Sequence, residues 1–197
     1  VRQKRIAIYI TSVVLLVVSI IGIYQIKISG SLIEDMPQES EFVNDIRFFE
    51  DEFNGIMPLE IMVDTKRKKG VMKLSTLKRM DALEDLIIEI PELSKPISVV
   101  SLVKYSKQAY YNGNTKFYQL PTSQENSFIL TYAKNSSSNI DLLKNFVDST
   151  GQYARITTFM KDIGTDKMER IEENLQTKID KVLPKERYDI TMTGKAL

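Results

Sequence analysis

The chain of 197 residues contains no cysteine, no histidine and no tryptophan. The absence of cysteine excludes disulfides and thiolate chemistry, and it permits an oxidising compartment without requiring one. The absence of histidine removes the imidazole proton shuttle. Together the two absences exclude Ser-His and Cys-His nucleophilic pairs and the usual zinc ligand sets within this chain, so a hydrolase of these kinds is disfavoured.

Paired carboxylates can bind Ca²⁺ or perform acid-base chemistry. None of their clusters has the spacing of a calcium-binding EF-hand loop, and adjacent acids on a helix point in different directions. The sequence has no glycine-rich phosphate loop either. We therefore expect solvated acidic faces, no catalytic residue, no metal site and no cofactor. The clusters are Glu34-Asp35, Glu50-Asp51-Glu52, Glu84-Asp85 and Glu172-Glu173.

One long apolar stretch, residues 6–24, contains no charge and no proline, and twelve of its nineteen residues are Ile, Val or Leu. As a helix it would be about 28 Å long, close to the roughly 30 Å hydrocarbon core of a bilayer. A cleavable signal peptide is a weaker interpretation, because the stretch is long and lacks a small-residue cleavage site. A buried strand or core helix is weaker still. The stretch predicts a transmembrane helix within residues 1–28.

Charges around this stretch predict its orientation. Arg2, Lys4 and Arg5 precede it and Lys27 follows it, so the positive-inside rule places the N-terminus in the cytoplasm and residues 29–197 outside. These four cations give the first 27 residues a net charge of +4, so the +1 of the whole chain leaves −3 for the remainder. A mildly acidic domain of this kind is a poor nucleic-acid binder.

The rest of the chain predicts an α+β domain. Helical spacing of apolar residues predicts helices over residues 39–53, 75–90 and 164–183, with Ser75 as an N-cap and Pro91 as a stop. Alternation and β-branched content predict strands over residues 59–64, 97–100, 155–160 and 188–193. Residues 101–150 form a weakly patterned insertion, with helices expected over 103–111 and 124–134. This order is the β-α-β-β-α-β arrangement of ferredoxin-like domains.

Two polar loops are also expected. Residues 66–69, of sequence KRKK, predict a solvated loop tip rather than a lipid-binding patch, because they would lie on the side away from cytoplasmic anionic lipid. Residues 135–139, of sequence NSSSN, predict a surface loop.

Several segments in this order resemble a known family. They are the cationic lead, the single span, SLIEDMP at residues 31–37, FFE at 48–50, PLEIMVDT at 58–65 and MTGKAL at 192–197. Together they are similar to one repeat of the resistance-nodulation-division (RND) superfamily, on its MmpL-like, predicted-exporter branch. The resemblance covers essentially the whole chain. It implies a fragment of a longer polypeptide, similar to the second half's porter domain and ending just before the next helix.

The resemblance implies a proton-driven exporter of lipids or other hydrophobic compounds in the bacterial inner (plasma) membrane. Residues 29–197 would be its extracytoplasmic, ferredoxin-like porter domain. Its expected partners are the bilayer, a hydrophobic substrate, the remaining transmembrane helices of the same polypeptide and further copies of itself. The proton-carrying acids of such transporters lie in a later helix, which agrees with the absence of Asp and Glu from residues 6–24.

Aromatic residues in the insertion are the candidates for contact with a hydrophobic substrate, because Tyr and Phe combine a large apolar surface with, in Tyr, a polar end. The alternative is ordinary packing of the insertion against the sheet. The candidate residues are Tyr105, Tyr110, Tyr111, Phe117 and Tyr118.

A second functional class also fits one span followed by an α+β domain, namely the extracytoplasmic sensor domain of a signalling receptor.

Overall fold

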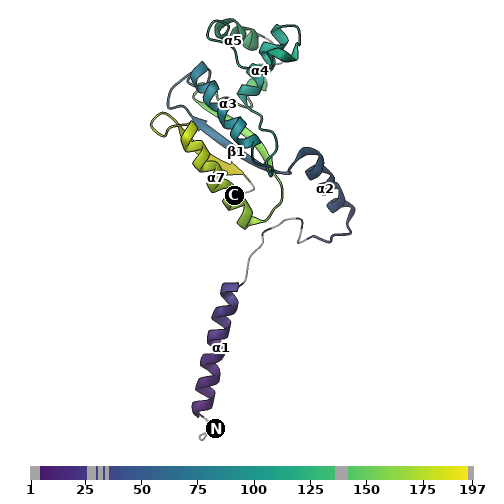
Figure 1. The fold of residues 1–197 in the computed structure, drawn as a ribbon, viewed down its shortest axis with the longest axis vertical. Helices are drawn as coiled ribbons and strands as arrows, with labels where there is room; N and C mark the ends of the chain where they lie inside the picture. The colour runs from purple at the N-terminus through teal and green to yellow at the C-terminus, as the bar shows by residue number, and fades with distance from the viewer. Residues whose placement is uncertain (1–4, 26–29, 31–32, 34–35, 136–141, 195–197) are drawn as a thin grey trace. The chain divides into compact units, whose positions relative to one another are not determined.

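The computed structural model describes residues 5–25, 30, 33, 36–135 and 142–194 (Figure 1). The chain divides into two compact units, residues 1–30 and 31–197. Residues 26–29, most of the polar loop at residues 135–139 and the last three residues lie outside the described residues.

The predicted span is helical. Helix α1 (Arg5–Gln25) has 21 residues, which corresponds to about 31 Å at about 1.5 Å per residue. Its sequence is apolar from Ile6 to Tyr24 and carries no charge there. Within the described residues, α1 is the one helix long and apolar enough to cross a membrane.

A three-stranded antiparallel sheet forms the centre of the second unit. Strand β1 (Met57–Asp64) lies between β2 (Tyr153–Met160) and β3 (Asp189–Gly194), and Ile61 of β1 is opposite Ile156 and Met192. Alternate residues of β1, from Met57 to Val63, are buried, because successive side chains point to opposite faces of a sheet. The domain is therefore α+β, as predicted.

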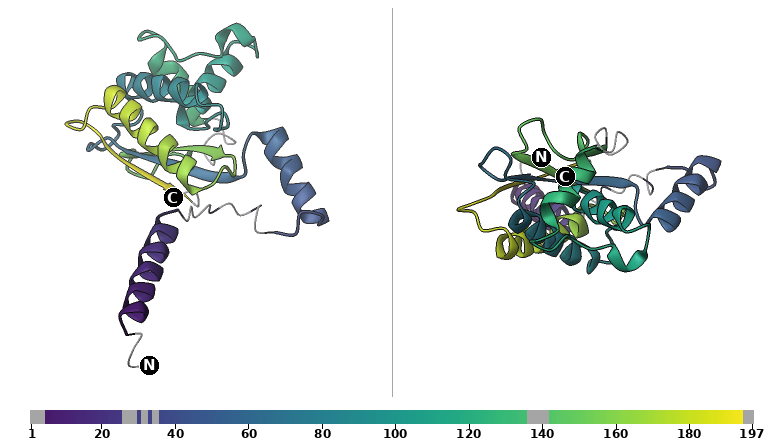
Figure 2. Two further views of the ribbon diagram at one scale, coloured as in Figure 1. Left: turned by 60° about the horizontal axis from the view of Figure 1, so that its bottom comes forward. Right: turned by 90° about the horizontal axis from the view of Figure 1, so that it is seen from above.

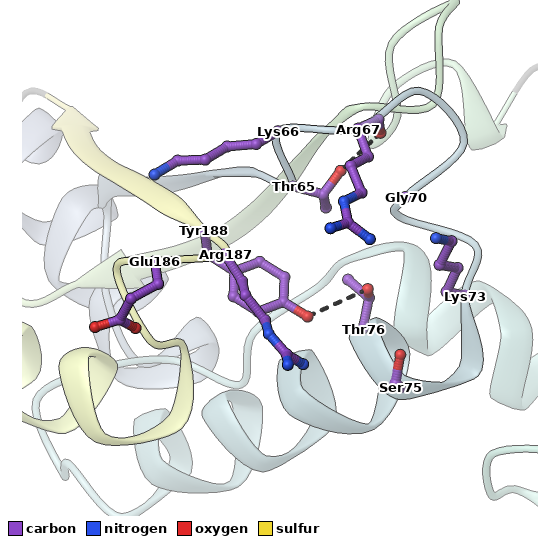
Figure 3. Close-up of a pocket in the computed structure, with 10 residues that line it drawn as sticks. All are labelled: Thr65, Lys66, Arg67, Gly70, Lys73, Ser75, Thr76, Glu186, Arg187 and Tyr188. Carbon is purple, nitrogen blue, oxygen red and sulfur yellow. Dashed lines mark hydrogen bonds between the residues drawn. The ribbon is translucent and has the colours of Figure 1, made fainter.

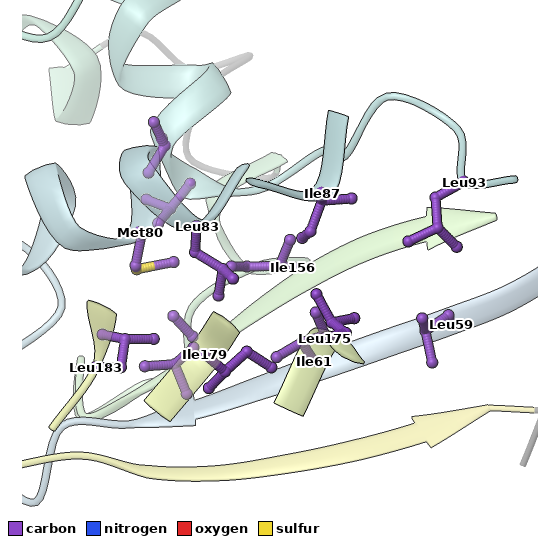
Figure 4. Close-up of a cluster of buried hydrophobic side chains, with 14 of the residues drawn as sticks. Leu59, Ile61, Met80, Leu83, Ile87, Leu93, Ile156, Leu175, Ile179 and Leu183 are labelled. Carbon is purple, nitrogen blue, oxygen red and sulfur yellow. The ribbon is translucent and has the colours of Figure 1, made fainter. Parts of the chain in front are cut away.

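Helices α3 (Leu74–Ile88) and α7 (Thr165–Val182) lie on one face of this sheet (Figures 1 and 2). Their apolar stripes meet the inward side chains of β1 and β2 in a continuous core (Figure 4). Truncation of one such buried side chain to alanine costs roughly 2 to 5 kcal/mol. The largest fully buried side chains of this core are Leu59, Ile61, Leu77, Met80, Leu83, Ile87, Ile156, Met160, Leu175, Ile179 and Leu183.

The prediction of a strand over residues 97–100 was wrong. Val99 and Val100 begin helix α4 (Val99–Tyr110), because the Ser98 hydroxyl caps it by accepting from the Val100 N–H at 2.9 Å. The segment before α4 pairs with the edge of β2 only through two isolated antiparallel bridges, Leu93 with Met160 and Ile97 with Thr157. The two β-branched valines favour an extended strand, but here the Ser98 cap stabilises the start of a helix instead.

The predicted N-cap of α3 was also wrong. The helix begins at Leu74 with Lys73 in the cap position, so Ser75 lies inside its first turn. The predicted helices of the insertion exist: α4 is followed by the short 3-10 helix η2 (Thr115–Phe117) and by α5 (Asn126–Asn135).

Helix α2 (Glu41–Phe53) also agrees with the prediction. Ser40 caps it by accepting from the Val43 N–H at 3.3 Å, and Asn54 ends it in the left-handed conformation with φ 58°. Only Val43 is buried, however, so most of its apolar stripe faces outward.

Candidate functional site

Three of the five aromatic residues singled out from the sequence come together in the insertion. Tyr110 lies 5.3 Å from Tyr111 between ring centroids, and Tyr111 stacks on Phe117 at 4.2 Å. Helix α5 adds Phe128 and Tyr132, at 5.3 and 5.5 Å from Tyr110. We call these five residues the aromatic cluster. Phe128 and Tyr132 were missed by the sequence reasoning, although their spacing of four residues places them on one face of a helix.

The other two predicted residues lie outside the aromatic cluster. Tyr105 is an exposed residue of α4. The Tyr118 ring lies 5.8 Å from the Lys95 ammonium, a cation–π contact with the segment that precedes α4. The five predicted residues therefore do not form one site.

A charged network supports the aromatic cluster. The ammonium of Lys107, a buried side chain of α4, lies 2.8 Å from the Glu125 carboxylate, which also accepts from the Tyr111 hydroxyl at 2.9 Å. The Lys107 ammonium, followed by the Thr122 N–H, lowers the pKa of Glu125 to about 2. The bond to Glu125 raises the pKa of Tyr111. These contacts fix the Tyr111 ring, so part of the aromatic cluster serves the packing of the insertion.

A second apolar surface contains open volume. Phe49 and Phe53 of α2, together with Ile97 and Phe159, line a groove of about 600 Å³ that we call the apolar groove. Phe49 and Phe53 stack at 5.6 Å between ring centroids and are 53% and 62% exposed. Glu52 and Lys95 provide charged groups beside this lining. A volume of this size is within the range of small-molecule pockets.

Hydrogen bonds hold α2 in position beside the sheet. The Asn54 side-chain amide donates to the Leu93 carbonyl at 2.8 Å, and the Ile56 N–H donates to the Met160 carbonyl at 3.1 Å. The Glu50 carboxylate accepts from the Asp162 N–H at 2.6 Å. These bonds connect the end of α2 to both segments that supply the opposite wall of the apolar groove.

Gly55 allows this close approach. It has φ 140°, and a Cβ atom there would lie 2.7 Å from the backbone of Met160. Any other residue would therefore strain the backbone and push α2 away from β2.

The one hydroxyl in the apolar groove is used for structure. The Ser94 side chain accepts from the Phe159 N–H at 2.9 Å and lies 3.3 Å from the Thr158 hydroxyl. The apolar groove thus offers apolar contact with charged groups beside it. It holds no nucleophile paired with a base.

No protein-family model matches the chain, and no curated protein matches it.

The carboxylates differ from the expectation of solvated faces in one important respect. Glu84 is 5% exposed and accepts a hydrogen bond from the Ser98 hydroxyl. Burial raises its pKa to about 7. Glu84 is buried because it lies seven residues after Leu77 and three before Ile87, on the inward stripe of α3. In the part of the chain that the structure describes, no group of three or more acids is arranged to hold a metal ion.

Proposed function

We propose that this chain is the porter module of an RND-type exporter of the MmpL-like branch, which moves lipids or other hydrophobic compounds at the expense of the proton motive force. In this proposal α1 spans a bacterial inner membrane with its N-terminus in the cytoplasm, and residues 29–197 are extracytoplasmic. The observation that carries the proposal is the open apolar groove on a domain that follows an apolar helix of membrane-spanning length.

The arrangement of the sheet supports a ferredoxin-like fold within this proposal. The segment with Leu93 and Ile97 follows α3 and pairs antiparallel with the edge of β2 that β1 leaves open. In a β-α-β-β-α-β chain, the second strand follows the first helix in the same way. We infer that residues 93–97 are a shortened second strand and that the helices from α4 to α5 are inserted before β2.

The chemistry of the apolar groove favours passage of an amphipathic molecule. Each methylene that leaves water for an apolar site contributes about 0.8 kcal/mol, so the rings of Phe49, Phe53 and Phe159 suit an acyl chain. The charged groups of Glu52 and Lys95 suit a polar end. Since Ser94 is used for structure, the apolar groove is suited to transfer a molecule unchanged.

The test is efflux of a fluorescent phospholipid analogue by proteoliposomes that contain the complete polypeptide and carry an imposed proton gradient. The double variant Phe49→Ser/Phe53→Ser removes the α2 wall of the apolar groove. Its control, Phe42→Ser/Ile88→Ser, removes two apolar side chains that are 60% and 53% exposed and do not line the apolar groove.

We expect the groove variant to lose about tenfold in efflux rate, equivalent to about 1.4 kcal/mol, and the control to lose less than twofold. A protonophore should abolish efflux by the unmodified protein. Equal loss in the two double variants, or efflux that is insensitive to the protonophore, contradicts the proposal.

A further inference from the structure

A cavity of about 360 Å³ lies where the loop after β1, the first turn of α3 and the segment before β3 meet (Figure 3). It shares no lining residue with the apolar groove. Four cationic side chains line it, Lys66, Arg67, Lys73 and Arg187, with Glu186 as the one acid among its lining residues. We call it the basic pocket.

The concentration of positive charge in the basic pocket is unusual for this chain. Its lining carries a net charge of +3, whereas the residues after the first 27 carry −3 as a whole. Like charges in one cavity repel each other and favour the presence of a counter-ion. Among the described residues, the ion pairs use other cations: Lys104, Lys107, Arg155, Lys178 and Lys185. The positive charge of Arg67, Lys73 and Arg187 thus remains available to an anion.

Two buried hydroxyl groups add neutral donors. Thr76 and Tyr188 are 3% and 6% exposed, and their hydroxyl oxygens lie 3.4 Å apart. A mutual bond uses one of their two hydroxyl hydrogens, which leaves the other available to a ligand. In Figure 3 the guanidinium groups of Arg67 and Arg187 lie on either side of this hydroxyl pair, and the Glu186 carboxylate is turned away from it.

The loop that carries the cations is held in place. The Thr65 hydroxyl is 3.0 Å from the Arg67 carbonyl and 2.9 Å from the Gln152 carbonyl, and the Lys69 N–H donates to the Thr150 carbonyl at 2.9 Å. Gly70 is also required, because a Cβ atom there would lie 2.2 Å from the Thr65 hydroxyl oxygen. Less ordering entropy is therefore lost when a ligand binds.

We propose that the basic pocket binds a phosphate group, presented either by a lipid headgroup or as a free phosphate. The forked donors of two arginines match phosphate oxygens, and the high positive charge favours phosphate over a singly charged carboxylate. The cavity is polar and little more than half the volume of the apolar groove, which suits a headgroup rather than an acyl chain. This proposal stands independently of the exporter assignment.

The test uses the full chain in micelles of an uncharged detergent and measures binding by isothermal titration calorimetry. One arm adds inorganic phosphate, and the other adds dihexanoyl phosphatidic acid below its micellar concentration. The test variant is Arg67→Gln/Arg187→Gln. The matched control is Lys68→Gln/Lys181→Gln, which removes the same charge from exposed residues that do not line the basic pocket. Tyr188→Phe removes one hydroxyl and no charge.

We expect saturable binding that weakens with added salt, at least tenfold weaker in the arginine variant, severalfold weaker in Tyr188→Phe and changed less than twofold in the control. Binding of inorganic phosphate assigns free phosphate as the ligand, and binding of the short-chain lipid alone assigns a headgroup. Arg67 and Arg187 are exposed, so circular dichroism should show unchanged folding. Equal weakening in the control, or no binding of either probe at millimolar concentration, overturns the proposal.

Discussion

The apolar groove and the aromatic cluster both expose phenyl or phenol rings, but their surroundings differ. Each contains one stacked pair of rings, Tyr111 with Phe117 and Phe49 with Phe53, but in the aromatic cluster the Lys107–Glu125–Tyr111 network holds the stacked tyrosine in place. In the apolar groove, Phe49 and Phe53 face an open volume of about 600 Å³ across from Phe159. Exposure alone therefore does not mark a binding surface. The volume beside the exposed rings distinguishes the candidate binding surface from packing.

The largest effect should come from adding a side chain at Gly55, where the end of α2 lies against the sheet. Gly55→Ala combines a positive φ with a Cβ contact at 2.7 Å to Met160, and we expect it to destabilise the domain by roughly 2 to 4 kcal/mol. The control Gly113→Ala also has a positive φ, but a Cβ atom there meets no atom within 4 Å, so it should cost about 1 kcal/mol. Urea unfolding of the full chain measures both. Equal losses would show that the contact with Met160 is unimportant.

The next effect is a pH dependence of the free energy of unfolding. It should arise where α3 meets α4, because the Ser98 hydroxyl donates to Glu84 there, and not at the apolar groove. The folded pKa of Glu84, about 7, lies above the ordinary glutamate value of 4.5, so the folded state binds the extra proton. Stability should therefore fall as the pH rises from about 4.5 to 7, by at most about 3 kcal/mol. Glu84→Gln should remove most of this decline in urea midpoints measured across that range. An equally steep decline in the variant would contradict the assignment to Glu84.

The smallest expected effect is a difference in stability between variants that lack the hydroxyl of Tyr111 or of Tyr110. Tyr111→Phe removes the hydroxyl that donates to Glu125, and we expect a loss of about 1 kcal/mol in stability. Tyr110→Phe removes a hydroxyl from a partly exposed ring and should change stability by less than about 0.5 kcal/mol. If the two variants have the same free energy of unfolding, the network does not support the aromatic cluster.

Local periodicity was sufficient to predict most of the fold. The stripes of α2, α3 and α7 and the alternation of β1 are short-range signals, and the structure confirms these elements. Val99 and Val100 were misjudged because β-branched residues are also accommodated in a helix when a capping hydroxyl precedes them. The order of elements was correct except where a cap replaced a strand.

The candidate surfaces were harder to predict, because their residues are far apart in the sequence. Phe159 is more than a hundred residues from Phe53, and nothing in either segment indicates that they line one groove. Arg187 likewise joins the cations near residue 67 through the pairing of β1 with β3. The expectation of a solvated face was wrong for Glu84, because this residue lies on the buried side of α3, where the Ser98 hydroxyl provides a hydrogen-bond partner.

The most direct test of the account is photo-crosslinking of the full chain, in detergent micelles, with a diazirine analogue of palmitic acid, followed by mapping of the labelled peptides by mass spectrometry. We expect labelling of the peptides with Phe49, Phe53 and Phe159, and loss of this labelling with excess palmitate. Labelling confined to α1, or spread over exposed apolar residues without competition by palmitate, would contradict the claim that the apolar groove binds hydrophobic molecules.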